Sequence, residues 1–301
     1  SPMVAADHER QHRAFLAAIQ LRHPWQFRNR GISERDEPVQ INVAPGWHAL
    51  LQRLFEEVEA RVPEAERGGF RWRRVQSTGG VLELHFDGVR ERVLSAVTRA
   101  RDVAAVCCEQ CGRSGWRRQV AGRYQVDCDR HFVERLLSAS RGGDRAAVRW
   151  WHRPQPSLGE RSPAEVVQTG PVPEVLIDQA LRAAMPDPPR LNGAHRQRLE
   201  GVWPLMQAQF SERLRSLRLA EFEPGRRASG TLLALMAGEV ASGEQANAVN
   251  ALARRGFSDL RLRLLGAGDL ERPARANDPW SCMLALEASV TIPRYRPTLP
   301  D

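Results

Sequence analysis

One short stretch in the middle of the chain, VCCEQCGRSGWRRQVAGRYQVDCDRHF at residues 106–132, holds four of the five cysteines. Cys108 and Cys111 form a C-x2-C pair, and after sixteen intervening residues Cys128 and His131 form a C-x2-H pair. Zinc takes four nitrogen or sulfur ligands in a tetrahedron, and two-residue spacing lets one tight loop supply two of them. We therefore expect a zinc ion here. Because four protein ligands leave no position for water, we expect it to be structural.

The residues between and after the two pairs indicate how the ligands are presented. RRQV and RYQV alternate like two strands joined by a turn at residues 121–122, and HFVERLLSAS predicts a helix that begins at the last ligand. A tight loop, a hairpin and a helix whose first turn supplies the second pair make up a treble-clef zinc finger. Cys107 cannot easily point the same way as Cys108, so we expect it to lie outside the site.

Buried thiols without a metal, or a redox C-x2-C pair, are the alternative interpretations of these cysteines. A redox pair requires neither the matching C-x2-H nor the hairpin between them. Five cysteines, four of them close together, also argue against a disulfide framework and for a metal in a reducing compartment. The polar start lacks an apolar signal core, and no apolar run reaches the roughly 20 residues of a membrane span. We therefore expect a cytoplasmic protein that does not bind membranes.

The chain before the cysteines predicts a small α-β-β-α unit. Apolar residues recur at helical spacing over residues 47–62, and a second such helix follows from residue 89. Between them, residues 69–75 and 81–86 alternate like two strands joined by a turn at Gly79 and Gly80. We assign this unit and the zinc finger to residues 45–141. Residues 1–44 are charged and irregular, and we expect a polar arm that is helical or partly disordered.

Residues 46–131 resemble small uncharacterised zinc-finger proteins of phages and prophages. That family combines a helix led by Gly-Trp, a hairpin and a CEVCG…LCDxH finger, and the corresponding segments here are GWHALLQRLFEEVEA, VQSTGGVLELHF, CEQCG and CDRH. The hairpin keeps the two glycines but lacks the usual lysine and phenylalanine around them. The resemblance implies a phage or prophage setting and carries no established activity.

Downstream of the finger we expect a helical segment over residues 142–186 and a separate C-terminal α+β domain over residues 194–301. In the first, Ser162, Pro163 and Glu165 form a capping box that begins a short helix. In the second we expect a long helix over 195–219, a helix at TLLALMAGEVA, and a further helix capped by Ser242 with Gln245. DLRLRLL and CMLALEASVTI alternate, which predicts two half-buried strands. The fold class is therefore α+β.

The stretch DRAAVRWWHRPQPSLGERSPAEVVQTG at residues 144–170 resembles the toxin-binding domain of Xre/MbcA/ParS antitoxins, and the match extends to about residue 185. The resemblance implies binding to a partner toxin, commonly an NAD-consuming enzyme of the RES type. Family members usually carry an N-terminal helix-turn-helix, whereas here the zinc-finger unit precedes the motif. The candidate partner-binding residues are Trp150, Trp151, Leu158 and Glu165.

All 44 basic residues are arginine, the formal net charge is +8 and the pI is 10.3. Coding bias in a GC-rich genome is one explanation, and a nucleic-acid surface is the other, because arginine forks phosphate oxygens. On the strand at 69–75 and on the zinc hairpin, basic residues interleave with aromatic ones. The candidate nucleic-acid residues are Arg71, Arg73, Arg74, Arg117, Arg118, Arg123 and Tyr124. A solvated strand face is the alternative interpretation.

No P-loop, G-x-S-x-G or H-E-x-x-H motif occurs, so the sequence offers no argument for catalysis. We expect a non-catalytic, zinc-containing binding or regulatory protein of a phage or toxin–antitoxin locus, with a toxin-like protein as its partner. Two alternatives stay open. One is a nucleic-acid-binding accessory or virion-assembly protein of a phage, and the other is an enzyme with an unrecognised site in residues 194–301.

Overall fold

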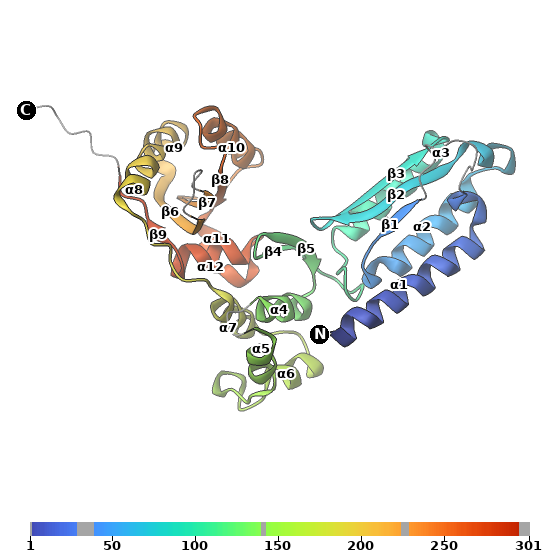
Figure 1. The fold of residues 1–301 in the computed structure, drawn as a ribbon, viewed down its shortest axis with the longest axis horizontal. Coiled ribbons are helices and arrows are strands. Elements are labelled where there is room, and N and C mark those ends of the chain that lie inside the picture. The colour runs from blue at the N-terminus through green and yellow to red at the C-terminus, as the bar shows by residue number, and fades with distance from the viewer. Residues whose placement is uncertain (1, 29–38, 140–142, 224–228, 295–301) are drawn as a thin grey trace, which may run out of the picture. The chain divides into compact units, whose positions relative to one another are not determined.

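The computed structural model describes residues 2–28, 39–139, 143–223 and 229–294 and is mixed α+β, as expected (Figure 1). The chain forms two compact units, Ser1–Arg135 and Leu136–Asp301. The first unit therefore ends within the helix that follows Cys128, slightly before the expected boundary at residue 141. The second unit contains both the helical segment and the C-terminal domain, which the sequence had suggested were separate.

A three-stranded sheet with helices over it forms the first unit. Its elements are α1 (Pro2–Arg22), β1 (Gln40–Asn42), α2 (His48–Arg61), β2 (Arg71–Thr78), β3 (Val81–Asp87) and α3 (Arg90–Ala104). Strands β2 and β3 are antiparallel and turn at Gly79 and Gly80, both of which have positive φ. The expected helix–hairpin–helix order is confirmed. Strand β1, which pairs in parallel with β2, was not expected.

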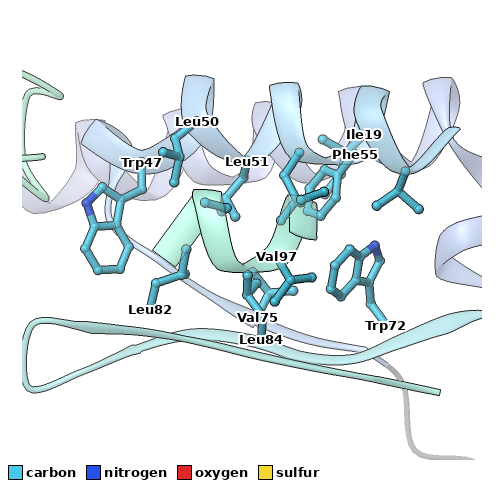
Figure 2. Packing of buried hydrophobic residues seen from close by; sticks show 14 of the residues in the cluster. Ile19, Trp47, Leu50, Leu51, Phe55, Trp72, Val75, Leu82, Leu84 and Val97 are labelled. Atoms are coloured by element: carbon cyan, nitrogen blue, oxygen red, sulfur yellow. The ribbon is translucent and has the colours of Figure 1, made fainter. Parts of the chain in front are cut away.

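The core of the first unit lies between the helices and one face of the sheet. Figure 2 shows side chains from α2 and the turn before it pointing toward the sheet residues Trp72, Val75, Leu82 and Leu84. Trp47, Phe55 and Trp72 have no exposed surface. On the other face, the register pairs Arg74 with His85 and Gln76 with Glu83, so that face is polar. The strict alternation along β3 is what assigns its residues to the two faces.

The described parts of residues 1–44 contain the expected helix, α1, but this helix packs into the core instead of forming a polar arm. Phe15 and Ile19 of α1 are buried in the same core as α2, and so are Trp25 and Phe27 in the short 3₁₀ turn Pro24–Phe27. A polar network then fixes this turn: the buried Gln26 amide donates to Phe55 O (2.8 Å) and its oxygen accepts from the Trp72 indole (3.0 Å). Phe15 and Ile19 are spaced about one helical turn apart, so both lie on the same face of α1.

The helical segment of the second unit comprises α5 (Gly143–His152), α6 (Pro163–Thr169) and α7 (Glu174–Ala184). The capping box that begins α6 is confirmed: Glu165 N donates to Ser162 Oγ (3.3 Å) and Ser162 N donates to the Glu165 carboxylate (2.6 Å). Helix α7 is tied to the C-terminal domain by ion pairs from Arg182 to Glu287 (2.8 Å) and from Arg272 to Glu174 (3.0 Å). The two segments therefore belong to one folded body.

A four-stranded sheet in the order β8-β7-β6-β9 organises the C-terminal part. Along the chain the elements are α8 (Gly193–Glu200), α9 (Val202–Phe210), β6 (Leu214–Glu223), β7 (Ser229–Met236), α10 (Glu244–Arg254), β8 (Leu260–Leu265), α11 (Ala267–Glu271), α12 (Pro279–Glu287) and β9 (Val290–Thr291). Strands β6 and β7 form an antiparallel hairpin, and α10 connects β7 to the parallel strand β8.

Several elements of this part differ from the sequence-based prediction. The expected helix over 195–219 is two shorter helices followed by β6, TLLALMAGEVA contains strand β7, and CMLALEASVTI contains most of α12. The strand at DLRLRLL is confirmed as β8. Gln245 does not cap α10: its amide donates to Leu262 O (2.5 Å) and its oxygen accepts from Leu264 N (2.9 Å).

Candidate metal centre

The structure brings the four predicted ligands together. One nitrogen or sulfur atom from each of Cys108, Cys111, Cys128 and His131 lies within 4.8 Å of all the others. The Sγ atoms of Cys111 and Cys128 are 3.8 Å apart, and His131 Nδ1 is 3.4 Å from Cys108 Sγ and 3.3 Å from Cys128 Sγ. A zinc tetrahedron has S–S edges of about 3.8 Å and S–N edges of about 3.6 Å. The donor set and the spacing therefore fit a tetrahedral metal ion.

Two local structures present these ligands. Cys108 and Cys111 lie on a tight loop in which Gly112 N donates to Cys108 O (2.9 Å), and Gly112 takes a φ of +74°. Beyond the loop, β4 (Trp116–Val120) and β5 (Arg123–Asp127) form the expected hairpin, and α4 (Asp129–Ser138) follows. Cys128 immediately precedes α4 and His131 lies in its first turn. Loop, hairpin and helix therefore occur in the expected order.

Three cysteines in contact cannot all remain ordinary thiols. The contact with the Cys128 thiol, the largest influence, lowers the pKa of Cys108 to about 3, and the same contact raises the pKa of Cys128. Burial raises the pKa of Cys111. A divalent metal would hold all three sulfurs as thiolates, because metals bind cysteine in its deprotonated form.

The second nitrogen of His131 is directed to a carboxylate. Its Nε2 lies 3.7 Å from Glu134 Oε2, one helical turn further along α4. A carboxylate behind a ligating histidine fixes the ring orientation and the tautomer that leaves Nδ1 free to bind. This arrangement supports Nδ1 as the ligand atom. Sequence reasoning did not single out Glu134, although the His-x-x-Glu spacing on a predicted helix was the signal for it.

A clamp from the start of α2 holds the Cys108–Cys111 loop, and sequence reasoning missed it. The backbone N–H of Gly46 donates to Glu109 O (2.7 Å), and the indole of Trp47 donates to Cys107 O (2.8 Å). A Cβ on Gly46 would lie 2.2 Å from Cys108 O, so only glycine permits this approach. The Gly-Trp pair had been noted only as the start of a helix. The pair also joins the core to the Cys108–Cys111 loop, which is called the metal loop below.

Three buried charged side chains and the half-buried Arg135 surround the hairpin behind the candidate metal centre. Asp127 and Arg135 form an ion pair at 2.7 Å, and burial raises the pKa of Asp127 to about 6. Arg118 has no exposed surface; its guanidinium lies 4.0 Å from the Trp116 ring centroid and 4.4 Å from that of Phe132. Glu109 accepts from Val126 N (3.0 Å) and from Ser77 Oγ (2.7 Å). These contacts join the hairpin to α4, the metal loop and β2.

The seven candidate nucleic-acid residues do not form one accessible surface. Arg71 and Arg118 are buried, with 6% and 0% of their surface exposed. Arg73 pairs with Asp87 (2.6 Å) near the start of β2, whereas Arg117 donates to Gly79 O (2.7 Å) at the other end of the same strand, with its guanidinium over the Tyr124 ring. Arg74 and Arg123 are exposed, and within the described residues neither side chain makes an ion pair or hydrogen bond, although the charge of Arg74 acts on Glu83 of the neighbouring strand. Charge is thus distributed along the strand instead of being gathered at one place.

The four candidate partner-binding residues occupy different environments. Leu158 is buried and Glu165 is engaged in the capping box, so both have structural roles within the segment. Trp150 and Trp151 of α5 are half-buried. Val148 on the same helix is 58% exposed, and sequence reasoning did not name it. The accessible apolar surface of this segment therefore centres on α5.

The comparisons with known proteins add no family: no family model, curated protein or solved structure matches the chain. Within the described residues, none of the helices is both long enough and apolar enough to cross a bilayer. The four-ligand cluster is also the only group of three or more histidine, cysteine or acidic side chains in the described residues that is placed to hold a metal.

Proposed function

We propose that Cys108, Cys111, Cys128 and His131 bind a structural zinc ion in a treble-clef finger. The tetrahedral spacing of three sulfurs and one nitrogen supports zinc, which favours this donor set. Four protein ligands leave no open position for a substrate or an activated water. The ion would stabilise the hairpin and the loop to which the Gly46–Trp47 clamp is attached.

Metal analysis of the purified protein tests this proposal. We expect about one zinc per chain, and Cys128→Ser should lose it, because a structural site rarely keeps its metal with a ligand removed. Cys107→Ser is the matched control, since Cys107 is adjacent but its sulfur is directed to backbone carbonyls of Gly46 and Gly112. Less than half a zinc per chain in the wild type, with no change on Cys128→Ser, would end the proposal.

We further propose that the protein is a non-catalytic binding protein that acts on a toxin-like partner through α5. The supporting observation is an accessible apolar helix, with Val148 exposed and Trp150 and Trp151 half-buried, in the segment that resembles the antitoxin domain. Exposed apolar patches on a folded unit mark interaction sites. The resemblance suggests an NAD-consuming enzyme as the partner and a phage or toxin–antitoxin locus as the setting.

Affinity capture from the native host, followed by mass spectrometry, tests this second proposal. We expect a toxin-like enzyme to be retained by the wild-type protein and lost with Val148→Asp, which places a charge on the exposed helix face. Val249→Asp is the matched control, because Val249 is also exposed (39%) but lies on α10. Recovery of no toxin-like enzyme, or equal recovery with both variants, would contradict the proposal.

A further inference from the structure

An open groove of about 650 Å³ lies in the first unit. One side is formed by α2 and the residues just before it. The other side is formed by residues between Val103, near the end of α3, and Ser114, just beyond the metal loop. Its volume falls in the range of sites that hold a small ligand or a few side chains of a peptide. The groove is distinct from the α5 surface, which belongs to the second unit.

The groove has an apolar wall and a single charge. Leu50 and Ala49 line it from α2, while Val103 and Val106, which line it from α3 and the turn after it, are 49% and 58% exposed. Two half-exposed valines facing a groove leave apolar surface that a ligand would remove from water. Among the described residues that line the groove there is no Asp or Glu, and Arg53 is the one basic residue.

Arg53 differs from the other arginines around it. Arg61, about two turns further along α2, pairs with Glu57 (2.7 Å). Arg92 of α3 pairs with Glu66 (2.6 Å). Within the described residues the Arg53 guanidinium has no carboxylate partner, and its one hydrogen bond is a long contact with Ala49 O of its own helix (3.4 Å). Its forked donors therefore remain available to an anionic group in the groove.

We propose that this groove binds an extended peptide segment of a partner protein that carries apolar side chains next to a carboxylate. The apolar side chains would pack on Val103 and Val106, and the carboxylate would pair with Arg53. With zinc bound, three thiolates leave the metal centre with a net negative charge, and Cys111 presents it to the groove. The carboxylate is therefore expected at the Arg53 side, and this sets the direction of the peptide.

The groove also depends on the metal loop being in place. Residues Cys107, Cys111 and Gly112 line it, and the clamp from Gly46 and Trp47 holds that loop against the start of α2. Loss of the ion would release one wall. Peptide binding is consequently expected to be metal-dependent even though the ion does not contact the peptide.

Two pools of fluorescein-labelled hexapeptides, used with the zinc-loaded full chain, test the proposal by fluorescence anisotropy. One pool alternates apolar and variable residues and ends in Asp or Glu, and the other has Asn or Gln at that position. We expect the acidic pool to bind at least about tenfold more tightly, since a charge-assisted hydrogen bond stabilises a complex by roughly that factor or more. Equal binding of the two pools, or binding of neither, would refute the proposal.

Two pairs of variants locate the binding. Arg53→Gln should lower the affinity for the acidic pool about tenfold, so that the two pools bind equally. Arg61→Gln should change neither the affinity nor the preference for the acidic pool. Val106→Asp should abolish binding, whereas Val81→Asp, at a residue that is 49% exposed but outside the groove, should not. Zinc content confirms that each variant is folded. An unchanged Arg53→Gln affinity, or displacement of the labelled peptide by a single-stranded oligonucleotide at lower concentration than by unlabelled peptide, would overturn the assignment.

Discussion

At the scale of single residues, the metal loop packs so closely against the residues before α2 that no side chain fits between the two backbones. Gly46 is the clearest case, because three backbone atoms lie within 2.6 Å of where a Cβ would be placed. Backbone atoms cannot move aside as the end of a flexible side chain can, so the neighbouring loop would have to shift. The candidate metal site thus depends on Gly46, which binds no metal itself and precedes Cys108, the first ligand, by 62 positions.

We expect Gly46→Ala to destabilise the first unit by more than about 2 kcal/mol, a size typical of severe steric clashes in a packed region. Urea unfolding followed by fluorescence measures this, because Trp47 and Trp72 report on the core. Gly68→Ala is the control, since a Cβ at Gly68 meets nothing within 4 Å. Similar free energies for the two variants would show that the clamp is not tight.

A second residue-scale expectation concerns acid stability. His48 stacks on Phe15 with ring centroids 4.1 Å apart, and burial together with His12 and His8 lowers the pKa of His48 from 6.5 to about 4. The unfolded chain therefore takes up a proton first as the pH falls, and the folded unit loses stability between pH 6.5 and about 4. Because His48 is only half-buried, we expect the loss to be about 1–2 kcal/mol.

The pH dependence of the difference between wild type and His48→Gln isolates this contribution from protonation of the metal ligands. The free energies of unfolding of wild type and His48→Gln should be closer to each other at pH 5 than at pH 7.5. A difference that stays constant between the two pH values would mean that His48 is not neutral in the folded state.

At the scale of secondary-structure elements, sequence patterns predicted the first unit better than the second. Alternation and helical spacing identified α2, β2, β3 and β8, each of which has one buried and one exposed side. Strand β7 and helix α12 are buried almost throughout, so the alternation in CMLALEASVTI did not mark a half-buried strand, and the types of the two elements were exchanged. Asp278 followed by Pro279 was the available signal for a helix start, since Asp278 accepts from Ser281 N (3.1 Å).

In the candidate site, too, some features could be predicted from the sequence and others could not. The four ligands could be predicted because metal spacing is local: two residues separate each pair, and a hairpin separates the pairs. The clamp, the Asp127–Arg135 pair and the groove join segments far apart in sequence, and only the folded chain brings them together. Arg118 illustrates the limit, since it was expected on an accessible basic surface and is instead enclosed between two aromatic rings.

Gln245 gives the element-scale prediction. Strand β8 is an edge of the four-stranded sheet, and the Gln245 side chain pairs with the backbone of Leu262 and Leu264 much as another strand would. We expect Gln245→Ala to lower the stability of the second unit by about 1–3 kcal/mol, because it leaves a backbone donor and acceptor unpaired. Analytical ultracentrifugation should also show concentration-dependent self-association.

Asn250→Ala is the control for that experiment, because Asn250 lies on the exposed side of the same helix α10. A Gln245→Ala variant that stays monomeric, with unchanged unfolding free energy, would show that the edge needs no cover from this side chain.

At the scale of the whole molecule, the chain forms two compact units, and the metal centre belongs to one of them. Stripping the metal with a chelator should therefore lower the unfolding temperature of the first unit alone. We expect calorimetry to show two transitions, of which the lower shifts by at least about 3 °C while the other is unchanged, as a loss of about 1 kcal/mol or more predicts for a domain of this size.

The control for chelation is Cys128→Ser, which should show the shifted transition before any chelator is added and no further change afterwards. A single transition that moves as a whole would indicate that the two units unfold together. Added zinc should restore the wild-type profile, which separates metal loss from irreversible damage.

The Gly46–Trp47 clamp has a consequence for how the protein is made. The Trp47 indole finds its acceptor at Cys107, sixty residues later in the chain. At ribosomal rates of about 5–20 residues per second, roughly 3–12 s pass between the synthesis of the two partners. During that interval α2 and the β2–β3 hairpin can already assemble, while the tryptophan has no partner and the last ligand has not been made. The proposed metal can therefore bind with its full ligand set only after His131, the last candidate ligand, has been synthesised.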